Sequence, residues 1–278
     1  MKMKVRKNNF FSFVLTLVLA VIFLLPLSML VTSSFMNAEQ IYSSHFSFIP
    51  KPFSLENFTT AFAKIDFLKA LANTLYLAVF NIIGVVVASS LAAYAFSAMT
   101  WKGRDLFFAI TLATIMLPDI VLLIPQFLFF KTLNLYGTLL PLILPYFCGL
   151  PFYIFLLRQF FIAIPKDLAD SARIDGASEF TIYKEIYMKL SKPAILIVVL
   201  FQFLLTWNDF MKPSIYLINE KQYTLSIALQ QFQSKLGGAQ WGPLMASVLL
   251  MIIPVVILFL FTQKYFIKGI ALQGLKES

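Results

Sequence analysis

The stretch Phe10–Val31 reads FFSFVLTLVLAVIFLLPLSMLV and contains no charged side chain. A helix of about 20 apolar residues spans the roughly 30 Å of hydrocarbon in a bilayer. The stretch therefore predicts a transmembrane helix. Four basic residues precede it, as they precede a secretory signal peptide. However, the run exceeds the apolar core of about 7–15 residues found in such signals, and no small-residue cleavage site follows. We expect this helix to be retained in the mature protein.

The composition of the whole chain points to a membrane domain. Of 278 residues, 60% are hydrophobic and only 13% are charged. Soluble domains carry about 25% charged residues, whereas a charge at the centre of a bilayer costs roughly 2.5–3.5 kcal/mol on insertion scales. The net charge of +9 is dispersed between apolar runs and forms no basic face or tail. This pattern argues against a nucleic-acid partner.

Five further apolar segments are long enough to cross a membrane. Several contain prolines, which are tolerated at membrane depth next to cavities or neighbouring helices. We therefore predict an all-α, polytopic membrane protein with six transmembrane helices and a single transmembrane domain over residues 1–278. Pro118 and Pro125 are expected to break the second of these five segments. The five segments are Leu71–Ala98, Leu106–Phe130, Leu139–Leu157, Pro193–Asn208 and Leu244–Thr262.

The distribution of lysine and arginine predicts the orientation of these helices. If the N-terminus lies inside and the segments alternate, 15 of the 22 Lys and Arg residues fall on the inner side. Cytoplasmic loops carry such an excess of basic residues. We expect a multi-pass protein of the bacterial cytoplasmic membrane with both termini in the cytoplasm. The long loop 158–192 then lies inside, and the stretch Asp209–Gly242 lies outside.

The inner loop 158–192 has the signals of two helices joined by a turn. Pro165 suits a first helical turn, and the Asp175-Gly176 step is a typical helix stop. Small residues gather at this bend, so a partner protein could approach closely. The residues alone leave open whether the pair docks a partner or lies on the bilayer. The second predicted helix carries an apolar stripe at helical spacing, made of Phe180, Tyr183, Tyr187 and Leu190.

The run Asp170–Ala177, DSARIDGA, resembles the EAA loop of ABC importer permeases, in which Glu-Ala-Ala is followed after three residues by Gly. The longer form typical of the carbohydrate (maltose-type) branch is particularly similar. This chain departs by Asp170 for Glu, by Ser171 for Ala, and by Lys189 where Pro is common. Other matching segments are Ala92–Phe96, Gly103-Arg104, Leu117-Pro118, Arg158–Phe161, Thr206–Phe210, Gln263–Gly269 and Gly274–Lys276.

The resemblance implies a type I ABC importer permease fold and a division of labour among subunits. In the family, the loop docks into a separate ATPase subunit that binds ATP and Mg. Closure of the ATPase subunits drives alternating access of the permease. The present chain has no phosphate-binding loop of the Gly-x-x-x-x-Gly-Lys type. It is therefore expected to be a permease without enzymatic activity or a cofactor of its own. The expected coupling residues are Asp170, Ser171, Ala172, Asp175, Gly176, Ala177 and Phe180.

The family also implies the partners. We expect a heterodimer with a second, homologous permease subunit, two ATP-binding subunits on the cytoplasmic side, and an extracytoplasmic solute-binding protein. The stretch Asp209–Gly242 is the expected contact with the binding protein. The expected function is the import of sugars or oligosaccharides.

Polar residues within the apolar segments are candidates for the translocation pathway. Asp119 is an ionisable group at predicted membrane depth, and such groups usually face a water-filled cavity or a partner. Sugars are bound by hydrogen bonds to their hydroxyls and by stacking on aromatic rings, and Tyr146, Phe203 and Trp207 could supply these rings. The alternatives are that the polar groups only bond neighbouring helices and that Trp207 anchors the helix at the interface. The candidates are Asp119, Gln126, Asn81, Gln202, Trp207, Asn208 and Asp209.

Three other functions remain open from the residues alone. The first is an ABC importer for another solute, such as glycerol phosphate or polyamines. The second is an ion-coupled carrier in which Asp119 is the ion site. The third is a membrane-embedded enzyme, which would need paired acids or metal ligands. Cys148 and His45 are the only residues of their types, so no metal site can rest on cysteines.

Overall fold

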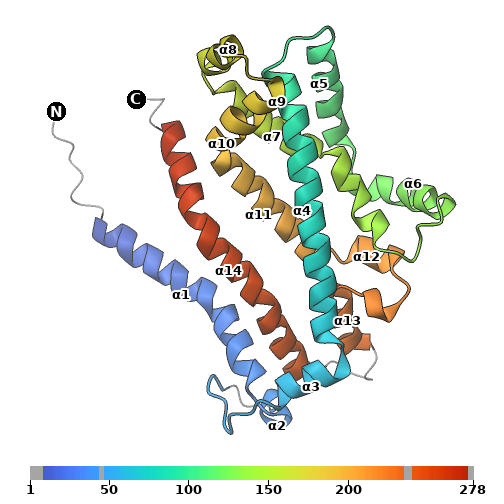
Figure 1. The fold of residues 1–278 in the computed structure, drawn as a ribbon. Helices are drawn as coiled ribbons and strands as arrows, with labels where there is room; N and C mark the ends of the chain where they lie inside the picture. Colours follow the sequence, from blue (N-terminus) through green and yellow to red (C-terminus); the bar gives the residue numbers. More distant parts are fainter. Residues whose placement is uncertain (1–8, 44–46, 235–239, 275–278) are drawn as a thin grey trace. The chain divides into compact units, whose positions relative to one another are not determined.

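The computed structural model describes residues 9–43, 47–234 and 240–274, and this part of the chain is helical without a strand (Figure 1). Among the predicted features, Lys2–Lys7, His45, Lys235 and Lys276 lie outside the described residues. The chain divides into two compact units, one formed by residues 1–67 and 228–253 and the other by residues 68–227 and 254–278. Each is described by itself.

The first unit contains α1 (Asn9–Ser34), α2 (Ala38–Ile41), α3 (Glu56–Lys64) and the start of α14 (Trp241–Gly274). Apolar side chains of α1 are exposed along its length, as a helix in lipid requires.

The buried side chain of Asn57 joins these helices. Its Nδ2 donates to the carbonyl oxygens of Ser34 (3.0 Å) and Met36 (2.7 Å). Gly242, in the first turn of α14, packs directly against its amide group.

The second unit is built around α4 (Phe67–Ser97), a 31-residue helix close to the predicted segment 71–98. It packs with α7 (Pro151–Ile162) and α11 (Lys192–Asn208). Their core includes aromatic side chains from the membrane helices and from the inner loop. The buried members are Val85, Ala93, Tyr94, Tyr153, Leu157, Phe161, Ile164, Ala169, Ile182, Tyr183, Tyr187, Ala194 and Val198.

The predicted segment Leu106–Phe130 is broken at Pro118, as expected, whereas the break expected at Pro125 is absent because Pro125 lies inside a helix. The segment forms α5 (Arg104–Ala113), a 3₁₀ turn at Thr114–Met116, and α6 (Asp119–Thr132), and the pair is bent by 99°. Pro118 explains the break, because proline disfavours helical backbone in the residue before it and has no N–H to donate. Leu117 accordingly has an extended ψ of 115°.

The predicted helix over Leu139–Leu157 is also interrupted. Residues Leu140–Leu142 and Leu144–Cys148 form 3₁₀ helices, and the α-helix α7 begins only at Pro151. Gly149 separates them at a φ of +78°, a conformation that favours glycine. In the described residues, four helices are long and apolar enough to cross a membrane, or six if each of two bent pairs counts as one span.

Predicted segments 193–208 and 244–262 correspond to α11 and α14, of which α14 extends further, to Gly274. Between them lie α12 (Met211–Tyr216), a 3₁₀ turn (Glu220–Gln222) and α13 (Leu225–Ser234). Residues 209–227 of this stretch are tied to α4. The Nδ2 of Asn73 donates to the carbonyl oxygens of Lys221 (2.9 Å) and Tyr223 (3.0 Å).

Candidate functional site

The inner loop folds as its sequence indicates. It contains α8 (Lys166–Ile174), a turn at Asp175-Gly176, α9 (Glu179–Ile182), a π-helical turn (Tyr183–Tyr187) and α10 (Met188–Leu190). Ser178 caps α9 by accepting a hydrogen bond from the Thr181 N–H (3.2 Å). The predicted pair of helices hinged at a glycine is therefore present.

Gly176 has a φ of +82°, which any side chain would strain. A Cβ placed there meets no atom within 4 Å, so the bend is open to a partner rather than packed within this chain. Apolar side chains flank this open bend. Ile174 is 87% exposed and Phe180 is 65% exposed.

The predicted apolar stripe is only half correct. Tyr183 and Tyr187 are buried in the core, but Phe180 and Leu190 are exposed. Phe180 lies in the first turn of α9, before the π-helical turn that packs against the core. Leu190 is the last residue of α10, after that turn. Of the predicted coupling residues, Asp170, Ser171, Asp175, Gly176 and Phe180 are exposed, and Ala172 and Ala177 are half-buried.

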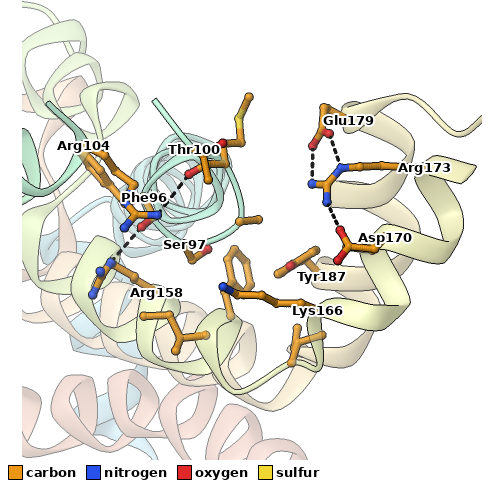
Figure 2. A pocket seen from close by; sticks show the side chains of 16 residues that line it. Phe96, Ser97, Thr100, Arg104, Arg158, Lys166, Asp170, Arg173, Glu179 and Tyr187 are labelled. Carbon is orange, nitrogen blue, oxygen red and sulfur yellow. Dashed lines mark hydrogen bonds and ion pairs between the residues drawn. The ribbon is translucent and has the colours of Figure 1, made fainter. Parts of the chain in front are cut away.

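An ionic cluster holds α8 to α9 (Figure 2). The Arg173 guanidinium donates from Nε to Glu179 Oε1 (2.7 Å) and from Nη1 to Asp170 Oδ1 (2.7 Å). Glu179 also accepts a hydrogen bond from the Tyr94 hydroxyl. The hydrogen bonds from Arg173 and then Tyr94 lower the pKa of Glu179 below its ordinary value, so this carboxylate stays charged at neutral pH.

The same residues attach the loop to the membrane helix α4. Tyr94 links to Glu179, and one turn earlier Ser90 Oγ lies 2.7 Å from the Tyr183 hydroxyl. The Tyr94 ring makes edge-to-face contacts with Tyr183 and Tyr187, with centroids 5.5 Å and 5.0 Å apart. The loop is thus fixed to α4 by hydrogen bonds and ring packing.

Ser90, Tyr94, Arg173 and Glu179 were not predicted as functional residues. One signal was available, because Ser90 and Tyr94 are four residues apart and so share one helix face. Their partners in the loop, Tyr183 and Glu179, lie 93 and 85 positions further along the chain, and no pattern in one sequence connects them.

The ionic cluster borders a cleft of about 680 Å³. Its walls come from the end of α4, the turn before α5, the end of α7, and the loop (Figure 2). Four basic side chains and two acidic ones line it, together with apolar groups. The charged ones are Arg104, Arg158, Lys166, Arg173, Asp170 and Glu179.

Three predicted pathway residues come together between α4 and α11. Asn81 Nδ2 and Gln202 Nε2 both donate to Thr206 Oγ1, at 3.2 Å and 3.1 Å. Trp207 stacks on Phe203 with ring centroids 5.0 Å apart. Trp207 is 1% exposed, so its interpretation as an interfacial anchor is wrong.

This buried cluster has unused hydrogen-bonding capacity. Within the described chain, Asn81 Oδ1, Gln202 Oε1 and Trp207 Nε1 have no hydrogen-bond partner. Unpaired buried polar atoms are unfavourable, so this region is suited to bind water or a polar ligand when it opens.

The other four pathway candidates are placed differently. Asp119 was expected near the middle of a helix. It is instead the first residue of α6, just after the bend, and it is exposed. Gln126 lies two turns later and is half-buried. Asn208 Nδ2 donates to the Leu204 carbonyl (2.8 Å), and Asp209 Oδ1 accepts from the Lys212 N–H (3.2 Å).

Lys212 connects Asp209 with the ring of Tyr146. Its backbone N–H donates to Asp209 Oδ1, and its Nζ lies 6.0 Å from the centroid of the Tyr146 ring.

Comparison with known proteins identifies the family. A family model described as "Binding-protein-dependent transport system inner membrane component" matches residues 81–272. The arabinooligosaccharides transport system permease protein AraQ of Bacillus subtilis is 32% identical, covering 94% of this chain and 93% of that protein. The trehalose/maltose transport system permease protein MalG of Thermococcus litoralis is 31% identical, covering 94% of each.

Solved structures agree on the fold. A chain from a bacterial ABC transporter involved in the import of the acidic polysaccharide alginate superposes with a TM-score of 0.83 at 23% identity, covering 96% of this chain and 100% of that one. Family match, relatives and fold together support one conclusion. The chain belongs to the family of binding-protein-dependent transport system inner membrane components, the permease subunits of ABC importers.

Proposed function

We propose that this chain is one permease subunit of an ATP-driven importer for oligosaccharides. Relatives that match over nearly their whole length carry names that specify arabinooligosaccharides, galactooligosaccharides, and trehalose or maltose. The chain supplies a pathway through the cytoplasmic membrane, and a separate ATPase supplies the energy.

The attachment of the inner loop carries this proposal. The loop presents exposed apolar side chains, Ile174 and Phe180, on either side of the open Gly176 bend. Its other face is fixed to α4 through Tyr94 and Tyr183. A partner that binds the Gly176 bend and moves it therefore also moves the membrane helix α4. This arrangement is suited to convert closure of an ATPase into alternating access.

The partners follow from this role. Two ATPase subunits, which hold ATP and Mg, seat the loop on the cytoplasmic side, with both termini of the chain on that side. A second, homologous permease subunit completes the pathway as a heterodimer. An extracytoplasmic solute-binding protein docks on the outer stretch Asp209–Gly242. Residues 209–227 of this stretch are fixed to α4 by the hydrogen bonds of Asn73.

The buried polar cluster between α4 and α11 is the proposed site of solute passage. Asn81 and Gln202 offer carbonyl oxygens that lack partners, and Trp207 and Phe203 offer stacked rings. Sugar hydroxyls donate to such oxygens, and sugar rings pack on aromatic faces. The cluster is closed in this conformation, so solute passage requires α4 and α11 to separate.

A substitution at the hinge tests the ATPase-docking role. We expect Gly176→Arg to insert into the membrane normally but to lose association with the cognate ATPase, because the new side chain occupies the open bend and the backbone is strained. Co-purification of tagged permease and ATPase measures this association. Gly103→Arg is the matched control, because Gly103 also has a positive φ (+88°) and lies in a different inner turn.

A third variant separates strain from bulk. Asn tolerates a positive φ better than most residues, so Gly176→Asn should retain more association than Gly176→Arg. Normal ATPase association of Gly176→Arg, or equal loss in Gly103→Arg, would refute the docking role.

A further inference from the structure

We propose that the cleft beside the loop binds the phosphate of an anionic lipid headgroup in the cytoplasmic leaflet. The cleft of about 680 Å³ lies where the ends of α4 and α7 meet the turn before α5 and the start of α8 (Figure 2). This site is separate from the exposed face of the Gly176 bend and from the polar cluster between α4 and α11.

The charges in the cleft are unbalanced toward the positive. Asp170 and Glu179 are both taken by Arg173. Arg104 forms an ion pair with Asp105, which does not line the cleft (Nε to Oδ1, 2.9 Å). In the described part of the chain, no carboxylate lies within ion-pairing distance of the remaining two cations, Arg158 and Lys166.

Arg158 is held in place but not neutralised. Its Nε donates to the Phe96 carbonyl (3.1 Å), and its guanidinium lies 4.0 Å from the centroid of the Phe108 ring. These contacts fix the planar group while the N–H groups at Nη1 and Nη2 keep their capacity to donate. The charges of Arg104 and of its partner Asp105 act on it in opposite senses. A guanidinium that is fixed in this way and keeps free N–H groups is suited to bind phosphate.

The surroundings of the cleft favour a lipid as the source of that phosphate. Trp101 and Phe107, in and just after the turn between α4 and α5, are 39% and 56% exposed. Trp is enriched at the level of lipid headgroups. The cleft itself also has apolar walls, including Met99 and Ile162. Basic pockets between membrane helices on the cytoplasmic side are suited to anionic headgroups.

A bound headgroup would have a mechanical consequence. Arg158 belongs to α7 and Lys166 begins α8, so one phosphate between them would brace the base of the loop against the membrane helices. The proposal rests on the predicted orientation, in which this loop is cytoplasmic. It does not depend on the solute that the importer carries.

Native mass spectrometry of the full-length chain in detergent, titrated with phosphatidylglycerol or phosphatidylcholine, tests the proposal. We expect tighter binding of phosphatidylglycerol. Each basic residue near a membrane surface contributes about 1 kcal/mol, or about fivefold in affinity. Lys166→Gln should therefore weaken phosphatidylglycerol binding about fivefold, and Arg158→Gln with Lys166→Gln roughly 25-fold.

Lys184→Gln is the matched control. Lys184 is an exposed lysine in the same loop, 3.9 Å from Glu185, and it does not line the cleft. Its substitution should leave phosphatidylglycerol affinity within about twofold. Lys166 is exposed, so the single variant remains informative if the double variant does not fold.

Other outcomes identify other occupants. Equal affinity for the two lipids, or equal loss in the Lys184 variant, would overturn the proposal. Stabilisation of the chain by inorganic phosphate alone, without preference between the lipids, would assign the cleft to a soluble phosphate and overturn the lipid source. Loss of lipid on addition of the ATPase would show that a protein surface fills the cleft, which also overturns it.

Discussion

At the scale of single residues, two glycines in this chain have opposite requirements. Gly176 needs its positive φ but has open space where a side chain would be. Gly242 has an ordinary backbone but no space, since a Cβ there would lie 2.3 Å from Asn57 Oδ1. Asn57 cannot withdraw easily, because its Nδ2 bonds the Ser34 and Met36 carbonyls. Glycine is thus required at one site by conformation and at the other by packing.

We predict that Gly242→Ala lowers the thermal unfolding midpoint of the purified chain. Overpacking costs about 1–3 kcal/mol, and displacement of Asn57 would also break its two hydrogen bonds. A double-mutant cycle with Asn57→Ala provides the check. The cost of Gly242→Ala should shrink in the Asn57→Ala background, and an unchanged cost would exclude this contact as the cause.

At the scale of elements, the connection between the loop and α4 decides whether docking of an ATPase has an effect in the membrane. Tyr94, Ser90 and their partners Glu179 and Tyr183 form this connection. It is distinct from the exposed bend around Gly176. Docking and transmission can therefore be disrupted separately, which distinguishes this arrangement from a loop that only lies on the bilayer.

We predict that Tyr94→Phe retains ATPase association but lowers transport per ATP hydrolysed, because the hydrogen bond to Glu179 is lost while the ring remains. Reconstituted vesicles in which solute uptake and ATP hydrolysis are both measured provide this ratio. Tyr76→Phe is the control, since Tyr76 is a half-exposed tyrosine of the same helix. An unchanged ratio for Tyr94→Phe would exclude this route of transmission.

At the scale of the whole molecule, the orientation of the chain in the membrane governs every functional assignment. The excess of Lys and Arg in alternate loops predicts that the loop 158–192 lies inside and the stretch 209–242 outside. The bend at Pro118 interrupts one apolar segment, and a second bend near Ser191 lies between the inner loop and α11. Orientation therefore needs a direct test in the intact membrane.

Cysteine labelling supplies this test. In a Cys148→Ser background, which removes the only native cysteine, we expect a membrane-impermeant thiol reagent added to intact cells to label Lys221→Cys but not Asp175→Cys. Both positions are exposed. Permeabilised cells should label both. Labelling of Asp175→Cys in intact cells would place the loop outside and would contradict both the coupling role and the lipid site.

The sequence by itself determined the helical membrane class, most of the helix positions and the hinge at Gly176. These features follow from local properties: apolar length, proline and glycine conformation, and capping signals. The break at Pro118 was expected from that proline, but the size of the bend and the interruption at Gly149 within 139–157 were not predicted, because hydropathy averages over such residues. Apolar length identifies a segment that belongs in lipid, but not whether it is straight.

Only the tertiary structure decided which residues meet. It paired Tyr94 with Glu179, buried Trp207 instead of placing it at an interface, exposed Asp119 at the start of α6, and gathered Arg158 and Lys166 around one cleft. The physical reason is that these contacts join helices far apart in the chain. Helical periodicity assigns a residue to a face, whereas the packing of other helices decides what that face meets.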